Sequence, residues 1–399
     1  MVTVNQDVSR VIAAGTATSP GNVLAVLRDD GPMTRQELRA RLGLSRATLM
    51  ERLDTLTRLR VIDTVGHRAS SGGRRAALLG ADQTSRVAVV AHLGASLATV
   101  GVADLRGTVL AVHHERLPLG HEPRHVLPWL LDTAREQLSS LDRYADLAAV
   151  GFAVPGQIDH ETGVSIMPPT MAAWRDQPLR DAFADGLGVS VQLENDANAL
   201  AYGEYLAAGS PNSTVLGVWI GSGIGAGVVI GGLPHRGATG CAGEIGHIRI
   251  EDRDERCGCG RRGCVAALAS GTALVRQLRS DGVRALPDVL RRVEAGEPRA
   301  VSLATDAGRL LGTVLATVVT ILNPHRVRVG GEIGSLRPFL AGLRETLGEQ
   351  APEVAARGLD VGPAVLGDLA PLVGMAGLAA EAVFAPAAID EAAARSRPS

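Results

Sequence analysis

The feature that most constrains this chain is a cluster of metal-binding residue types near its middle. Glu-Ile-Gly-His at 244–247 is followed, after a short spacer, by Cys-Gly-Cys-Gly-Arg-Arg-Gly-Cys at 257–264. One imidazole and three thiolates suit tetrahedral zinc, and thiols this close together and interleaved with glycine can fold back onto one ion. Cysteines of an apolar core need no such spacing. The sequence therefore predicts a structural zinc site with four ligands: His247, Cys257, Cys259 and Cys264.

The composition of the 399-residue chain describes a soluble protein with more than one domain. Its 46% hydrophobic residues and net charge of −2 allow at least two substantial cores. No apolar run reaches the roughly 18 residues that span a bilayer, and the N-terminus lacks a basic start followed by an apolar stretch. Four cysteines, three of them in the metal motif, fit a reducing compartment. We expect a cytoplasmic protein with no membrane association.

The near-neutral total hides a difference between two parts of the chain. Residues 19–80 contain eleven Arg and six Asp or Glu, a net charge of +5, so the remainder is acidic. A basic segment joined to an acidic body is expected if only the first part meets a polyanion. A solvated, charged helix face would give the same count, so charge alone leaves both interpretations open.

Residues 1–18 are small and polar without a strong period, and we expect a flexible arm there. Residues 19–80 then predict a winged helix-turn-helix. An apolar helix face from Asn22 stops at Asp-Gly-Pro, Thr34 and Glu37 form a capping box for a second helix, and Gly43 ends it. Ser45 caps a third helix, and two strand-like runs around a basic tip complete the wing.

In this arrangement the third helix would enter the major groove, and the wing would contact the DNA backbone or the minor groove. Arg46, Ala47, Thr48, Met50 and Arg52 occupy the expected outer positions of the helix. The residues that we predict to bind DNA are Ser45, Arg46, Thr48, Arg52, Arg74 and Arg75.

From residue 84 to about 385 the pattern changes to buried apolar strands that alternate with helices, which predicts an α/β domain with its chemistry at the carboxyl ends of strands. A meander at 87–112 opens the domain. A second start at 214–230, with strand, glycine turn and strand, predicts two similar lobes, about 84–196 and 197–385. We expect the Ala- and Arg-rich tail, 386–399, to be disordered.

Together these elements resemble the ROK family, named for repressors, open reading frames and kinases. The resemblance is strongest in Glu-Asn-Asp-Ala-Asn at 194–198, in Ala-Gly-Glu-Ile-Gly-His at 242–247 and in the cysteine cluster. It implies a two-lobed, actin- and hexokinase-like (ribonuclease H-like) fold, and the winged helix is similar to the operator-binding domain of the repressor branch.

The resemblance also implies roles for residues of the cleft. Asp196 matches the general base of the family's sugar kinases, since a carboxylate within hydrogen-bonding reach makes a sugar hydroxyl a better nucleophile. His247 would hold zinc through one ring nitrogen and face the sugar with the other. On local grounds alone, Asp196 could equally cap the helix that follows it. The predicted sugar-binding residues are Asn195, Asp196, Glu244 and His247.

Three positions depart from the kinase pattern. His92 stands where kinases of this class carry the aspartate that coordinates Mg²⁺, and an imidazole is a poor substitute for a hard oxygen ligand. Ala266 replaces a glutamate that contacts the sugar, and Thr170 replaces a common asparagine. Glycine turns at 221–227 and 330–331 remain but also serve as plain tight turns. We therefore expect neither ATP nor Mg²⁺ as a cofactor and no catalytic residue in use.

Three functions remain open from the sequence. The first is a transcriptional regulator, a repressor of carbohydrate-related genes, whose degenerate sugar-kinase-like domain senses a sugar or sugar derivative and whose homodimer or homotetramer binds double-stranded operator DNA. The second is an ATP-dependent sugar kinase, similar to a glucokinase, with an attached DNA-binding domain; Asp196 keeps it open. The third is a constitutive DNA-binding protein with no small ligand, which Ala266 and Thr170 would suit.

Overall fold

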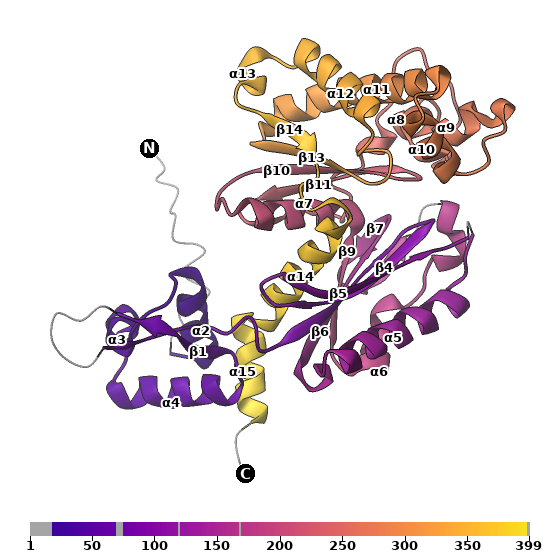
Figure 1. Ribbon diagram of the computed structural model, residues 1–399. Helices are drawn as coiled ribbons and strands as arrows, with labels where there is room; N and C mark the ends of the chain where they lie inside the picture. The colour runs from indigo at the N-terminus through magenta and orange to yellow at the C-terminus, as the bar shows by residue number, and fades with distance from the viewer. Residues whose placement is uncertain (1–17, 69–74, 119, 167–168, 397–399) are drawn as a thin grey trace.

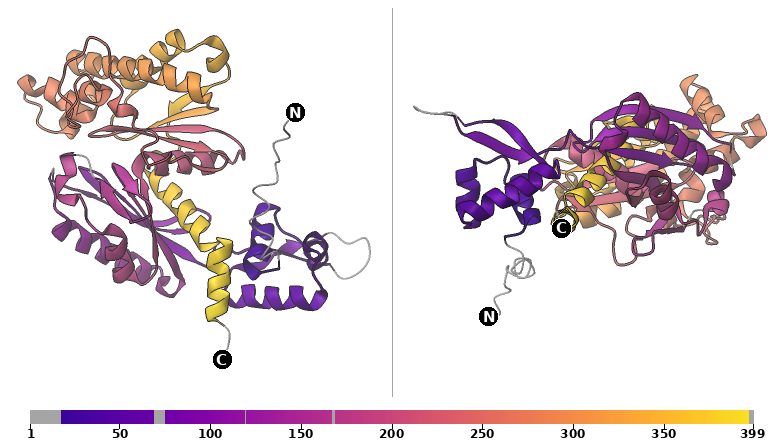
Figure 2. Two further views of the ribbon diagram at one scale, coloured as in Figure 1. Left: turned by 180° about the vertical axis from the view of Figure 1, so that it is seen from behind. Right: turned by 90° about the horizontal axis from the view of Figure 1, so that it is seen from below.

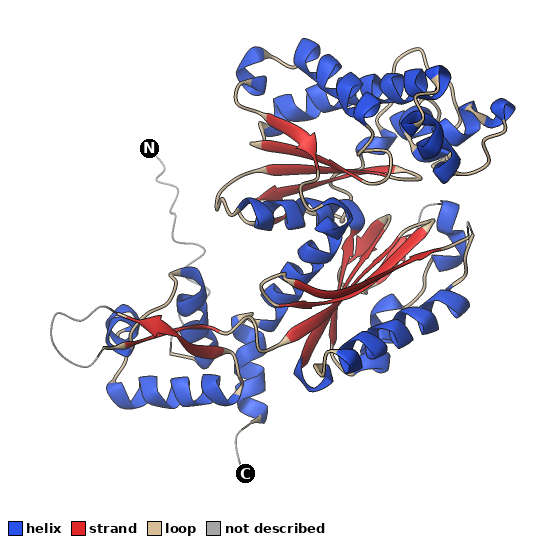
Figure 3. Ribbon diagram, in the orientation of Figure 1, coloured by secondary structure: helices blue, strands red, loops and turns tan. Residues whose placement is uncertain are grey.

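The computed structural model describes residues 18–68, 75–118, 120–166 and 169–396. An N-terminal helical domain with a two-stranded wing stands beside a larger body made of two stacked α/β lobes (Figure 1). Each lobe contains one central sheet with helices against it (Figure 3). Two C-terminal helices run from between the lobes to the N-terminal domain, where the end of the chain lies.

The N-terminal domain has the three helices and the wing expected from sequence. Thr34 and Glu37 form the predicted capping box, Gly43 ends the second helix with a left-handed φ of 66°, and the Ser45 side chain caps the third helix. Apolar side chains such as Leu24, Leu38 and Leu53 are buried between the helices. The elements are α2 (Pro20–Asp29), α3 (Arg35–Leu42), α4 (Arg46–Arg58), β1 (Ile62–His67) and β2 (Ala77–Ala81).

The first lobe is built on a sheet with the strand order β5-β4-β3-β6-β9. The first three strands in sequence pair antiparallel, and the next two add in parallel. Its strands are β3 (Val87–Leu93), β4 (Leu97–Asp104), β5 (Val109–Arg116), β6 (Leu147–Val154) and β9 (Ser190–Asn195), with a hairpin of β7 (Gln157–Asp159) and β8 (Val164–Ile166). Its helices are α5 (Pro123–Ser140) and α6 (Leu179–Leu187).

The second lobe repeats this order as β12-β11-β10-β13-β14, again with three antiparallel strands followed by two parallel ones. The expectation of two similar lobes is confirmed by this repeated topology. The strands are β10 (Val215–Ile220), β11 (Ile224–Ile230), β12 (Leu233–Pro234), β13 (Arg326–Gly330) and β14 (Asp360–Pro363). The helices are α8 (Val265–Ala269), α9 (Gly271–Gln277), α10 (Leu286–Glu294), α11 (Pro298–Leu322), α12 (Arg337–Gln350) and α13 (Glu353–Ala356).

Two helices lie between the lobes. α7 (Asp196–Ala208) packs on β10 and β11 of the second sheet, and α14 (Ala370–Val383) packs on α7 and on β3 and β6 of the first sheet. The chain therefore returns to the first lobe after completing the second, which the division at 197–385 did not anticipate. Because α7 begins where β9 ends, any change at that junction acts on a helix that contacts both halves of the body.

The expectation of a disordered tail is wrong for residues 386–395. They form helix α15 (Pro386–Arg395), which packs against α2 of the N-terminal domain, as the view from behind shows (Figure 2). Ile389 is buried in this contact, and the backbone N–H of Gly21 donates to Asp390 Oδ1 at 2.7 Å. A partner distant in sequence thus orders the segment. Residues 1–17 and 397–399, parts of the expected arm and tail, lie outside the described residues.

One helix of the described chain, α11, is long and apolar enough to cross a bilayer. It packs along its length against α12, and side chains such as Leu311 and Leu315 are buried in the second lobe. A core helix of a globular domain has the same composition, so this helix is weak evidence for a membrane span.

Candidate functional site

The candidate nucleic-acid interface is the outer face of α4 together with the wing. Ser45, Arg46, Ala47 and Met50 are exposed, whereas Thr48 is half-buried and its hydroxyl lies 2.8 Å from that of Ser45. The Ser45 hydroxyl also accepts from the Thr48 backbone N–H, so one side chain both caps α4 and borders its exposed first turn. The start of α4 therefore presents polar groups and a cation outward, as a reading helix requires.

The arginines of this domain differ in how free their guanidinium groups are. Arg46 and Arg75 are exposed, and among the described residues neither forms an ion pair. Arg52 is half-buried, with Nε donating to the Thr18 carbonyl at 2.8 Å and Nη1 paired with Glu51. Arg74, the other predicted wing contact, lies outside the described residues. Arg46 and Arg75 are thus more available to phosphate or bases than Arg52.

The first half of the candidate sugar site lies where β9 ends and α7 begins. The half-buried Asn195 is the N-cap of α7: its amide oxygen accepts from the backbone N–H groups of Ala197 and Asn198, and its amide nitrogen donates to the Gly156 carbonyl. The Asn195 side chain therefore caps α7, a structural role that the resemblance did not imply. One N–H of its amide remains for a ligand.

Asp196 is almost entirely buried, with 6% of its surface exposed. Its Oδ1 accepts from the Ala197 backbone N–H at 2.8 Å, but the N-cap of α7 is Asn195, so the interpretation of Asp196 as the capping residue is wrong. Burial, with a smaller contribution from the nearby Glu244 carboxylate, raises the pKa of Asp196 to about 7 against the opposing effect of that hydrogen bond. Near neutral pH the group is therefore divided between a form that accepts protons and a form that donates them.

The second half of the site comes from the loop after β12. Gly243 adopts a φ of 94°, and a Cβ there would lie 1.8 Å from the Ala226 carbonyl oxygen, so only glycine allows this loop to pass β11. Glu244 follows, and the short helix η3 (Ile245–His247) then ends on His247. His247 Nε2 lies 3.7 Å from Glu244 Oε2. The Glu244 carboxylate is near enough to Asp196 to contribute to the raised pKa of that carboxyl.

The four predicted metal ligands come together as one cluster. Their ligand atoms all lie within 4.8 Å of one another, and they are the only such group of His, Cys, Asp and Glu in the described part of the chain. His247 Nδ1 lies 3.6 Å from Cys257 Sγ, and Cys259 Sγ lies 3.8 Å from Cys264 Sγ. Cys241 is exposed and stands outside the cluster.

These separations suit a tetrahedral ion. Zn–S bonds of about 2.3 Å and Zn–N bonds of about 2.0–2.1 Å, set at tetrahedral angles, place two sulfurs about 3.8 Å apart and a sulfur and a nitrogen about 3.6 Å apart. The donor set and its geometry therefore fit a closed zinc site. Because Nδ1 of His247 faces the thiols and Nε2 faces Glu244, the same ring belongs to both the metal cluster and the candidate sugar site.

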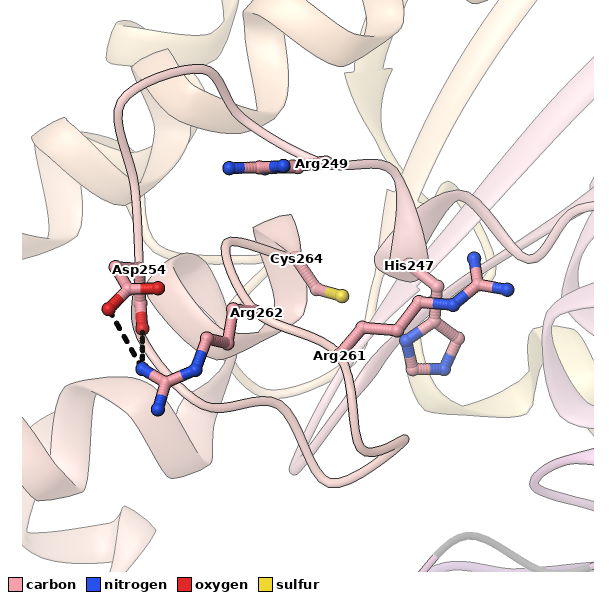
Figure 4. Close-up of a pocket in the computed structure, with 6 residues that line it drawn as sticks. All are labelled: His247, Arg249, Asp254, Arg261, Arg262 and Cys264. Atoms are coloured by element: carbon pink, nitrogen blue, oxygen red, sulfur yellow. Dashed lines mark hydrogen bonds and ion pairs between the residues drawn. The ribbon is translucent and has the colours of Figure 1, made fainter.

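A hollow of about 460 Å³ adjoins the cluster (Figure 4). Within it Arg262 is tied to Asp254 by an ion pair of 2.8 Å, and Arg249 and Arg261 complete the lining with His247 and Cys264. Three thiolates and a divalent ion carry a net charge of −1, so neighbouring guanidinium groups offset the charge of the loaded cluster.

One of the residues that depart from the kinase pattern lies against the second lobe. His92, at the end of β3, is 3% exposed, and its ring stands edge-on to Trp219 of the second lobe with centroids 4.9 Å apart. Burial lowers the pKa of His92 to about 4, so the ring is neutral at physiological pH. Its Nε2 finds no hydrogen-bond partner among the described residues. The neighbouring Ser96 hydroxyl donates to Glu332 Oε2, across the lobes, at 3.5 Å.

Two other departures can be placed only in part. Ala266, on α8, has its methyl 3.3 Å from where a Cβ on Gly246 would lie, which puts it beside His247. The side chain of Thr170 lies outside the described part of the structure.

The sequence analysis missed two residues of this region. Glu194 is fully buried, and Arg236 of the second lobe donates to its Oε2 through both Nε and Nη2, each at 2.8 Å. Glu194 belongs to the motif Glu-Asn-Asp-Ala-Asn at 194–198, but the resemblance implies roles only for Asn195 and Asp196. Arg236 carried no signal of its own, because its partner lies 42 positions away.

Comparisons with known proteins match both parts of the chain. The family model described as "ROK family" matches residues 89–382, and the model "Winged helix-turn-helix DNA-binding" matches residues 21–63. The xylose repressor of Bacillus subtilis is 27% identical over 89% of this chain and 93% of its own length.

Two solved structures resemble the whole chain and its body respectively. A ROK family transcriptional regulator, described as a homologue of the E. coli MLC protein, is 25% identical, with a TM-score of 0.74, over 93% of this chain and 98% of its own. A ROK family glucokinase from Streptomyces griseus, solved with glucose and AMPPNP, is 29% identical, with a TM-score of 0.61, over 73% of this chain and 98% of its own.

Proposed function

Because this chain belongs to the ROK family and carries a winged helix-turn-helix ahead of the family's two-lobed domain, we propose that it is a DNA-binding transcriptional regulator. In this proposal it represses carbohydrate-related genes in the cytoplasm, and the two-lobed domain senses a sugar or sugar derivative. Sugar bound between the lobes changes their relative orientation, and this changes the distance between the winged helices of two paired chains. That distance must match DNA half-sites about 34 Å apart.

The observation that carries the proposal is the extent of the similarity. Relatives described as repressors or transcriptional regulators match this chain along about nine-tenths of its length, the winged helix included, whereas the glucokinase matches only the two-lobed body. The exposed Arg46 at the start of α4 agrees with a surface that contacts DNA.

We assign the cleft residues as follows. Asn195, Asp196, Glu244 and His247 bind sugar hydroxyls, and the cluster of His247 with three cysteines holds zinc. The metal would be structural: with four protein ligands it leaves no open position, and it would fix the imidazole so that Nε2 faces the sugar. Arg46, Ser45 and Thr48 contact bases or phosphates from α4, and Arg52, Arg74 and Arg75 contribute from the end of the surface and from the wing.

A second candidate function, an ATP-dependent sugar kinase, is favoured by one observation. Asp196 keeps the position and the raised pKa that suit a general base. The neutral, buried His92 opposes it, since Mg²⁺ prefers oxygen ligands. Ala266 also opposes it, because the resemblance implies a glutamate at that position that contacts the sugar. We infer that the chain is not an enzyme.

The test of the proposed function is selection of a binding sequence from random double-stranded DNA, followed by titration of that sequence. We expect Arg46→Ala to weaken binding roughly tenfold or more, because a guanidinium contact to a base is worth about 1–3 kcal/mol. The zinc content should stay at one ion per chain. Arg309→Ala, an exposed arginine of α11, is the matched control and should bind DNA normally.

D-Xylose and D-glucose, added separately at millimolar concentration, test the sensing part of the proposal. Release of DNA by either sugar would support it. If the wild-type protein selects no sequence at all, the proposed function is wrong; if it selects one but Arg46→Ala binds it unchanged, Arg46 does not belong to the reading surface.

A further inference from the structure

The two halves of the candidate sugar site are joined by an ion pair whose carboxylate is buried, and neither of its residues is among the predicted ligands. Glu194 is the second-last residue of β9 of the first lobe, and its side chain has no exposed surface, while the side chain of Arg236, in the loop after β12 of the second lobe, is 41% exposed. Both Nε and Nη2 of Arg236 donate to Oε2 of Glu194 at 2.8 Å. A charge-assisted, doubled contact of this kind fixes orientation as well as distance.

The other carboxylate oxygen of Glu194 organises the residues next to it. Oε1 accepts from the backbone N–H of Asn195 and from the side-chain amide of Asn198, each at 3.0 Å. Asn195 in turn caps α7 and precedes Asp196. The Glu194 carboxylate therefore orients the turn between β9 and α7, which carries the first-lobe residues of the site, and Arg236 compensates its charge. His160, with Nε2 at 3.6 Å from Oε1, is the other titratable neighbour.

On its own side, Arg236 begins the loop that leads to the second-lobe half. Its carbonyl accepts from the Ala242 backbone N–H, and the loop continues through Gly243 to Glu244 and His247. A second contact joins the same loop to the first lobe: the Gln157 side-chain amide donates to the Thr239 carbonyl at 2.6 Å. Two contacts therefore hold this loop to the first lobe, and only the contact of Arg236 involves Glu194.

We propose that Arg236 is a positioning residue for effector recognition: through Glu194 it sets Asn195 and Asp196, and through its own loop it sets Glu244 and His247, so that the site exists only while the pair is intact. That the ligand is a sugar rests on the proposed function. The ion pair of Arg236 with Glu194, called the bridge below, does not depend on that function. Removing Arg236 leaves a buried carboxylate without its cation, which must reorient, gain a proton or admit water.

Hydrogen exchange measured segment by segment on the full-length zinc protein tests the bridge without any ligand. We expect Arg236→Ala to speed exchange about tenfold or more in residues 195–198 and in 236–247, while the winged helix and the zinc content stay unchanged. Gln157→Ala is the matched control: it removes only the hydrogen bond to the Thr239 carbonyl, so exchange should rise in 236–247 but not in 195–198.

Two further variants separate positioning from loss of packing. Arg236→Lys keeps the charge but has a single nitrogen, so we expect smaller increases in exchange rate, confined to the same segments. If Arg236→Ala fails to fold, Arg236→Lys replaces it in the comparison with wild type. The double variant Arg236→Ala with Glu194→Gln retains the Oε1 acceptor and removes the unpaired charge, and we expect it to recover protection in 195–198 but not in 236–247. Unchanged exchange at 195–198 in Arg236→Ala, or in Arg236→Lys if only that variant folds, overturns the proposal.

Calorimetric titration with D-xylose and with D-glucose then links the bridge to recognition. For either sugar that binds the wild-type protein, we expect Arg236→Ala to weaken binding at least about tenfold and Arg236→Lys to restore part of it. Equal affinity of wild type and Arg236→Ala would overturn the positioning role even if exchange had changed. If neither sugar binds the wild-type protein, the sugar assignment of the proposed function fails, and exchange alone decides the bridge.

Discussion

Asn195 and Asp196 are adjacent, yet the structure gives them different work. The Asn195 amide is largely engaged in capping α7 and in reaching Gly156, while Asp196 retains a second carboxylate oxygen for which no donor is found among the described residues. Of the two, Asp196 is better placed to respond to a ligand, because its protonation state is balanced near neutral pH.

The raised pKa of Asp196 makes the stability of the fold depend on pH. Between about pH 4, the ordinary pKa of an aspartate, and about pH 7, its value here, the folded protein keeps a proton that the unfolded chain has lost. The stabilisation is complete below about pH 4 and is lost as the pH rises through 7.

We therefore predict that wild type loses on the order of 3–4 kcal/mol of unfolding free energy relative to Asp196→Asn between pH 4 and pH 8, since the amide does not titrate. Urea unfolding of both proteins across that range measures the difference. A difference that stays flat with pH would show that the carboxyl has an ordinary pKa.

How far the sequence predicts this site depends on whether a residue acts through its neighbours in the chain. The metal cluster could be predicted because its ligands lie within 18 positions of one another and their spacing is itself the signal. The bridge of Glu194 and Arg236 could not, because no local pattern marks an arginine whose partner is brought to it by the stacking of two lobes.

At the scale of elements, long apolar runs predicted strands and amphipathic periods predicted helices, since both signals are local. The missed elements are short, such as β12 and β14, or depend on a distant partner. Helix α15 is of the second kind: its Ala- and Arg-rich sequence is weakly apolar, and it is ordered by packing on α2. The order of strands within each sheet is not encoded in any local period.

The docking of α15 on α2 leads to a prediction about Gly21. A Cβ at this position would lie 2.2 Å from the Pro386 carbonyl oxygen, a backbone atom that cannot yield without moving α15. We expect Gly21→Ala to destabilise the protein by about 1–3 kcal/mol through overpacking, and to expose the junction between the domains to trypsin. Differential scanning calorimetry and timed digestion measure the two effects.

Gly348→Ala is the matched control, a helical glycine of α12 with nothing within 4 Å of the added methyl. It should be neutral or stabilising by up to about 1 kcal/mol, because alanine has the higher helix propensity. Equal and small effects of the two substitutions would mean that α15 is not firmly docked.

At the scale of the whole molecule, the two lobes share one topology and face each other across α7 and α14. In the resemblance to sugar kinases, a nucleotide would be held by turns from both lobes. In this chain His92 at the first-lobe turn lies against Trp219 of the second lobe, and Glu332 of the second lobe lies 3.5 Å from Ser96 and 3.6 Å from Arg116 of the first. Burial raises the pKa of Glu332, yet any ionised fraction would repel phosphate.

These contacts lead us to predict that the protein does not phosphorylate sugars. Transfer of a phosphoryl group needs Mg²⁺ held by oxygen ligands beside the phosphates. At the first-lobe turn the chain offers instead a buried, neutral imidazole, and the nearby Glu332 carboxylate accepts from Ser96. Incubation with ATP, Mg²⁺ and a panel of hexoses and pentoses, followed by mass spectrometry of the sugars, should give no more sugar phosphate than Asp196→Ala does. Turnover by the wild-type protein that disappears in Asp196→Ala would show that the general base is in use and that the kinase function survives, because a contaminating kinase would be indifferent to that substitution.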